Sequence, residues 1–214
     1  ERAAEARRLT KVMSTVVNAE TAARAKVCNM NGYQAGIDAM RKEMRASAAV
    51  AALKELARDI PLTHSGGPAS VWLCFGVKGG GKVRGASFSP VACYINAITI
   101  DNRNATGWSN LANSDGGTVQ GKAYDKKACA VMALSINENS APGWNILGVL
   151  GGGEVNGSTV SQITCFERAV TAEPKTALYW RNLGSRGGGT VNGAAYGQFA
   201  CYARAFALKP NDAL

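Results

Sequence analysis

The feature that most constrains this chain is a tryptophan that returns at a constant interval. The interval of 36 residues separates successive members of the series Trp72, Trp108, Trp144 and Trp180. Three further columns keep the same step: Cys93, Cys129, Cys165 and Cys201; Val83, Val119, Val155 and Val191; Gly85, Gly121, Gly157 and Gly193. Because a fixed period of this length is the signature of repeat architectures, the sequence predicts four copies of one structural unit.

Each unit is predicted to contain two helices separated by a Gly-rich segment. In the first helix a small residue, the tryptophan and a leucine or phenylalanine three places later form an apolar stripe of helical period. The glycines end that helix because glycine is entropically costly there and readily takes positive φ. The second helix is expected to begin near Phe88, Tyr124, Val160 and Tyr196. In the last two units it is expected to end at Pro174 and Pro210.

These residues resemble a known repeat family. Trp-x-x-Leu-Gly, an aromatic residue followed by alanine in the second helix, and the closing proline are similar to the tetratricopeptide repeat, whose usual unit has about 34 residues. The longer step and the Gly-rich loop followed by valine also resemble the Sel1-like repeat. The tyrosine that the family carries in its first helix is a glycine here. The resemblance covers about 68–212 and implies an all-α fold, a right-handed α-solenoid of antiparallel helix pairs.

The domain organisation follows from the same period. An N-terminal helical segment is expected over 1–60 and a turn-forming linker over 61–67. The four repeats are expected at 68–104, 105–140, 141–176 and 177–212, and residues 213–214 repeat the opening of the fourth unit, which predicts the start of a fifth. Apolar residues at three- and four-residue steps give the N-terminal segment a packing seam: Met30, Tyr33, Ile37, Met40 and Met44. That seam is expected either to cap the first repeat or to bind a partner.

Two motifs that suggest chemistry are better explained by structure. The segment 116–122 matches the start of a phosphate-binding P-loop, but Ala123 stands where magnesium coordination needs Ser or Thr. The equivalent loops keep the glycines and lack the lysine, so the glycines are predicted to serve the turn. The cysteines include no C-x-x-C pair, and His64 is the single histidine, so a zinc site is not predicted.

The remaining chemistry favours a chain that is not an enzyme and has no cofactor, metal or small-molecule substrate. No nucleophile motif accompanies His64. The strict phase of the tryptophans predicts core positions rather than stacking platforms for nucleic-acid bases. The repeated cysteines are expected to be buried thiols in an intracellular, reducing compartment, with the organelle left open.

Partners are suggested by charge and by the family resemblance. The net charge is +9, which suits acidic proteins or RNA, and no apolar run is long enough to span a membrane. In tetratricopeptide proteins the first helices line a concave groove that binds a peptide or a helix. The resemblance implies that this groove contains Lys78, Ser109, Asn110, Asn113, Asn145, Arg181, Asn182, Ser185 and Arg186. Their amide, hydroxyl and cationic groups suit peptide amides and carboxylates, although they are also ordinary solvated residues.

The function predicted from these observations is a protein–protein interaction scaffold or adaptor, a structural subunit of a larger assembly that binds other proteins in its groove. The alternative is a basic subunit of an RNA-containing, ribonucleoprotein assembly. Salt separates the two, because binding to phosphate weakens steeply as ionic strength rises.

Overall fold

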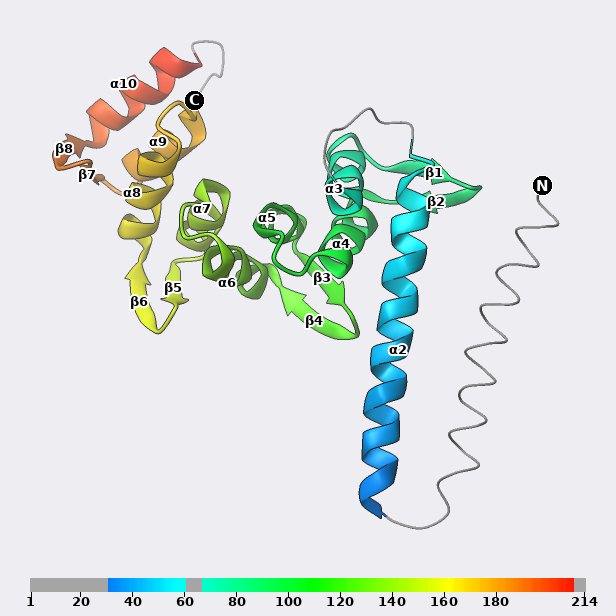
Figure 1. Cartoon of the computed structure of the whole chain (residues 1–214). Helices are drawn as coiled ribbons and strands as arrows, with labels where there is room; N and C mark the ends of the chain where they lie inside the picture. The colour runs from blue at the N-terminus through cyan, green and yellow to red at the C-terminus, as the bar shows by residue number, and fades with distance from the viewer. Residues whose placement is uncertain (1–30, 61–66, 210–214) are drawn as a thin grey trace. The chain divides into compact units, whose positions relative to one another are not determined.

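The structure is a computed structural model of the chain, and it describes residues 31–60 and 67–209 (Figure 1). The chain divides into two units, Glu1–Ala52 and Leu53–Leu214. Helix α2, Asn31–Ala57, runs from the first unit into the second. Of the expected N-terminal seam only Met44 has a described side chain, which is exposed. The expected linker, apart from Gly67, and residues 210–214 lie outside the described ranges, as do Cys28, His64 and Pro210.

The rest of the second unit is a series of helix pairs. The first helices are α3 (Pro68–Val77), α5 (Ala105–Asn113), α7 (Ala141–Val149) and α9 (Ala177–Gly184). The second helices are α4 (Pro90–Ile100), α6 (Lys126–Ile136), α8 (Gln162–Ala172) and α10 (Gln198–Leu208). The two helices of each repeat pack against each other, and each second helix also contacts the first helix of the next repeat. The described part of the chain is therefore mostly helical, with adjacent helices packed in pairs.

The Gly-rich segments are not plain loops: each folds into a two-stranded antiparallel hairpin. The strands are β1 (Gly81–Val83) with β2 (Ala86–Phe88), β3 (Gly116–Val119) with β4 (Lys122–Asp125), β5 (Gly152–Val155) with β6 (Ser158–Ser161), and β7 (Gly188–Val191) with β8 (Ala194–Gly197). The expectation of an all-α fold is therefore wrong. The second helices also begin later than expected, because the aromatic residues thought to open them lie in the second strands.

The hairpin turns explain the repeated glycine column. In the third repeat Asn156 and Gly157, the two central turn residues, have φ of 50° and 78°. Two successive positive φ values are the pattern of a type I′ turn, whose twist matches that of the paired strands. The other three hairpins have the same pair of positive φ values at their tips. The segment that matches the start of a P-loop, 116–122, forms the second of these hairpins.

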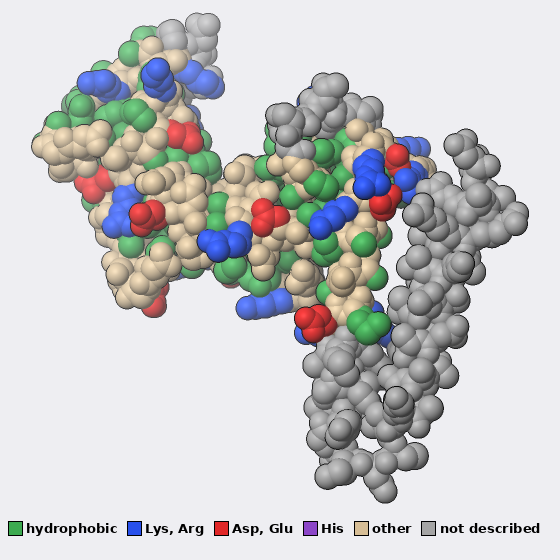
Figure 2. All heavy atoms as spheres, in the orientation of Figure 1, with side chains coloured by type: hydrophobic (Ala, Val, Ile, Leu, Met, Phe, Trp, Pro, Cys, Tyr) green, Lys and Arg blue, Asp and Glu red, His purple; other side chains and the backbone are tan. Residues whose placement is uncertain are grey.

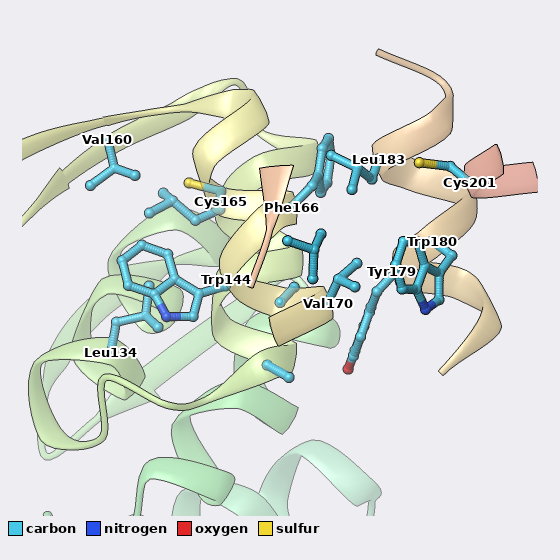
Figure 3. Close-up of a cluster of buried hydrophobic side chains, with 14 of the residues drawn as sticks. Leu134, Trp144, Val160, Cys165, Phe166, Val170, Tyr179, Trp180, Leu183 and Cys201 are labelled. Atoms are coloured by element: carbon cyan, nitrogen blue, oxygen red, sulfur yellow. The ribbon is translucent and has the colours of Figure 1, made fainter. Parts of the chain in front are cut away.

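The repeated tryptophans are core residues, as predicted. Each is at most 2% exposed, and Figure 3 shows Trp144 among Leu134, Val160 and Cys165. The indole N–H of Trp144 donates to the carbonyl oxygen of Glu138 at 2.5 Å, and Trp108 and Trp180 make the equivalent bond six residues upstream. In three repeats the ring also meets the aromatic residue of its own hairpin edge-on, with centroids 4.8 to 4.9 Å apart. One side chain thus joins the helix pair, the hairpin and the preceding turn.

The first repeat obtains its missing neighbour from the end of α2. The indole N–H of Trp72 donates to the carbonyl oxygen of Leu53 at 2.9 Å, in place of a preceding repeat turn. Ala57 and Ile60 are 5% and 4% exposed and share a cluster with Trp72 and Phe75. The segment 53–60 therefore covers the N-terminal end of the array of repeats.

The repeated cysteines are buried free thiols, as expected. Cys93, Cys129, Cys165 and Cys201 are each 0% exposed. Burial raises the pKa of the first three from its ordinary value of 9.0 to about 11, and it raises that of Cys201 as well. The folded chain therefore keeps these thiols protonated at a pH where an unfolded chain ionises them.

Stability is expected to fall between pH 9 and pH 11. Below pH 9 the thiols are protonated in both states, and in this window only the unfolded state loses protons, which favours unfolding. The loss is at most about 2 to 3 kcal/mol for each thiol whose pKa moves by two units. Urea unfolding at several pH values measures it, and Cys165→Ala should show a smaller pH-dependent loss than the unmodified chain. A free energy of unfolding that stays level across this window would contradict the burial of the thiols.

Candidate protein-docking site

Three of the residues expected to line a groove instead link neighbouring repeats. Ser109 and Asn145, which follow the tryptophans of the second and third repeats, are 2% and 9% exposed. The Ser109 hydroxyl lies 3.0 Å from the Ser140 hydroxyl, at the start of the next repeat. The side-chain amide of Asn182 donates to Asn145 Oδ1 at 2.7 Å, which joins α7 to α9. Because buried polar groups need such partners, these contacts fix the stacking of the repeats.

The other six residues are distributed over three repeats. Lys78, Asn113, Arg181, Ser185 and Arg186 are exposed, and Asn110 is half-buried. The Ser185 hydroxyl donates to the carbonyl oxygen of Asn182, within its own helix end. Of these six residues, Arg181 lies at a hollow in the described surface, between α9 and α10.

That hollow, here called the terminal groove, has a volume of about 420 Å³. It is lined by Lys175, Thr176, Ala177, Leu178, Arg181, Tyr202, Ala205, Phe206 and Lys209. Figure 2 shows Lys and Arg side chains beside hydrophobic ones over α9 and α10. All the lining residues but Arg181 were missed from the sequence, because their columns are core positions in the other repeats.

The repeat periodicity shows why the terminal groove is open. Ile98, Leu134 and Val170 occupy one column of the second helices, and each is 0% exposed. Phe206 occupies the same column in α10 and is 60% exposed. The first three pack under the first helix of the following repeat, whereas no described helix follows α10. The chemistry of the column is thus unchanged, and only its cover differs.

Helix α10 has an apolar face on both sides. Cys201 and Ala205 are 0% and 7% exposed and point into the fourth repeat. Phe199, Tyr202 and Phe206, spaced by three and four residues, lie along the other side of the helix. Phe199 is 87% exposed, and Leu178 of α9 adds a third large exposed apolar side chain at 41%.

The rim of the terminal groove is basic. Lys175, Arg181 and Lys209 line it, and none of the described residues that line it is acidic. Under this end of the array, burial and then the nearby Glu173 carboxylate raise the pKa of Tyr179 to about 12, so its phenol stays neutral. The site is an apolar centre with a cationic edge.

This arrangement can hold a macromolecular surface, and it offers no reaction centre. Within 31–60 and 67–209 no group of three or more His, Cys, Asp or Glu side chains is placed to hold a metal ion. The high thiol pKa values also make the four buried cysteines poor nucleophiles. Comparison with known proteins gives no relative, since no protein-family model matches the chain and no curated protein matches it.

Proposed function

We propose that this chain is a protein–protein interaction scaffold, a structural subunit that binds other proteins and has no catalytic role of its own. We further propose that its packed pairs form a right-handed α-solenoid related to tetratricopeptide and Sel1-like repeats, with a β-hairpin added to each repeat. The observation that carries the function is the column of Ile98, Leu134, Val170 and Phe206, buried three times and 60% exposed once.

Exposed apolar side chains at the end of a repeat array favour association. Burying a phenylalanine or leucine side chain completely contributes about 1.5 to 3 kcal/mol. Phe199, Phe206 and Leu178 retain most or much of that potential. Their burial together would contribute roughly 4 kcal/mol, before the entropic cost of association. A patch of this kind with a polar rim is typical of a protein-docking site.

The cationic rim also keeps an RNA-binding role as the second candidate. Lys175, Arg181 and Lys209 lie together without an acidic lining residue, and the chain has a net charge of +9. Phosphate contacts predict binding that weakens steeply with salt and depends little on Phe206. Apolar docking predicts the opposite on both points, and the exposed phenylalanines favour it.

Two features bear on where the scaffold works. The buried free thiols support a reducing, intracellular compartment, which we propose on that ground. Across the two described ranges, each helix is too short or too polar to cross a bilayer.

The test compares what the chain captures with and without its exposed phenylalanine. Tagged chain, a Phe206→Asp variant and a Val77→Asp variant are used in quantitative affinity capture at two salt concentrations. Val77 is the matched control, since it is 66% exposed but lies in the first repeat. We expect proteins retained at high salt by the unmodified chain and by Val77→Asp, and lost at least tenfold with Phe206→Asp, because a buried hot-spot contact is worth about 2 kcal/mol. Recovery of the same proteins with Phe206→Asp would contradict the proposal.

A further inference from the structure

We infer that the terminal groove binds an amphipathic helix of a partner protein, one that carries a small residue opposite Phe206 and acidic residues beside its apolar face. This inference rests on the proposed function and adds the chemistry of the partner. It follows from three properties of the array: the size of the residues that meet in the equivalent column, the charges on the rim, and the covered N-terminal end.

The small residue follows from size matching inside the array. A Cβ added to Gly107 would lie 3.0 Å from Ile98, and one added to Gly143 would lie 3.1 Å from Leu134. The first helix therefore places a glycine directly on the large side chain of the preceding repeat. In the fourth repeat the equivalent residue is Tyr179, and it joins the buried cluster of the smaller Val170 (Figure 3).

Large residues thus meet small ones in this column, as close packing requires. Phenylalanine is larger than isoleucine, leucine or valine. A helix that lies across Phe206, as α5 lies across Ile98, must therefore place a glycine or alanine there. A bulky residue at that point would hold the two helices apart and forfeit the surrounding contacts.

The acidic flanks follow from the rim. Lys175 and Arg181 approach the groove from the α9 side and Lys209 from the end of α10. Carboxylates on the partner helix would meet these cations, which sets orientation and raises the association rate.

The charges also argue against a second copy of this chain as the occupant. A symmetric pairing of two terminal grooves would bring the same cations face to face. A head-to-tail pairing would need an open N-terminal end, where Ala57 and Ile60 already cover the first repeat. A helix from a different, acidic partner satisfies both conditions.

The probe for this inference is a synthetic helical peptide of about 20 residues, long enough to form a helix. Its apolar face carries one central alanine, and glutamates flank that face. Fluorescence anisotropy of the labelled peptide measures binding to the full chain. We expect saturable binding that Phe206→Asp weakens at least tenfold, that Val77→Asp leaves within about twofold, and that Lys175→Glu combined with Arg181→Glu weakens about fivefold.

A size exchange supplies the sharper arm. Replacing the central alanine of the peptide with tyrosine should weaken binding to the unmodified chain about tenfold, through overpacking. The Phe206→Val variant recreates the pairing of Val170 with Tyr179 and should recover most of that loss for the tyrosine peptide. Coupling of this sign between the two sites is the signature of direct contact.

Three results would overturn the inference: no saturable binding of the alanine peptide, equal losses for the two peptides with Phe206→Val, or tighter and steeply salt-dependent binding of a labelled oligouridine. If partner capture still depends on Phe206 while the peptide arms fail, the scaffold function stands and only this description of the partner is wrong.

Discussion

Replacing Trp144 with alanine is expected to lower the free energy of unfolding by about 4 kcal/mol, the usual cost of removing a large aromatic side chain from a packed core. Trp144 is 2% exposed, and its indole N–H bonds to Glu138 across the turn that precedes the repeat. The guanidinium of Arg168 lies 4.5 Å from the centre of its ring and would lose that contact as well. A loss of this size is a large fraction of the stability of an ordinary domain.

Urea unfolding measures this effect, with Val149→Ala as the control. Val149 lies in the same helix but is 56% exposed, so its truncation should change stability by less than about 0.5 kcal/mol. If the two variants lost equal stability, the repeated tryptophan would not be the centre of the repeat.

The second large effect is expected at the glycine that opens each hairpin. Gly152 has φ of 89°, and a Cβ added there would collide with the backbone carbonyl oxygen of Val160 in the paired strand. The obstacle is backbone rather than a flexible side chain, so the hairpin must open to relieve it. Gly152→Ala should therefore cost about 3 kcal/mol or more, because the collision adds to the strain of positive φ.

Gly157 provides the matched control in the same hairpin. Its φ is 78°, but an added Cβ would meet nothing within 4 Å. Gly157→Ala should cost only about 1 kcal/mol, the strain of the left-handed backbone alone. Thermal unfolding of both variants measures the difference. Equal losses would show that steric contact between the strands does not determine the first glycine, and that the hairpin geometry is different from the one described.

The period of 36 residues was enough to locate the repeats, their helix pairs and their core. The tryptophan and cysteine columns were predicted to be buried and are, because a side chain that returns in strict phase in a stacked array meets the same neighbours each time. Helix ends were less well predicted. The second helices begin at Pro90, Lys126, Gln162 and Gln198, after the second strand rather than at its aromatic residue.

The hairpins were missed although a local signal for them exists. Asn156-Gly157 and Asn192-Gly193 are the dipeptides most typical of a type I′ turn, each preceded by a valine that the structure buries. The tetratricopeptide resemblance gave the glycines a sufficient role in ending the first helix, which drew attention away from strand pairing. The other two tips, at Arg84 and Gln120, carry no such dipeptide, yet they have the same backbone.

The terminal groove could not be found by pattern alone. In sequence, Phe206 is one more member of a core column, and only the three-dimensional arrangement shows that its cover is missing. The expected groove on the first helices failed to separate exposed from buried positions for a related reason. Asn145 and Asn182 look like solvated amides, whereas in space they reach each other across two repeats at 2.7 Å.

The measurement that tests the central claim most directly is amide hydrogen exchange on the purified chain, alone and in complex with the protein it captures. Exchange reports local opening, so a docked helix should slow it in the elements that the helix covers. The account predicts new protection over Ala177–Gly184 and Gln198–Leu208, with α3 and α4 unchanged. Protection confined to the first helices of the inner repeats, with no change in α10, would contradict it.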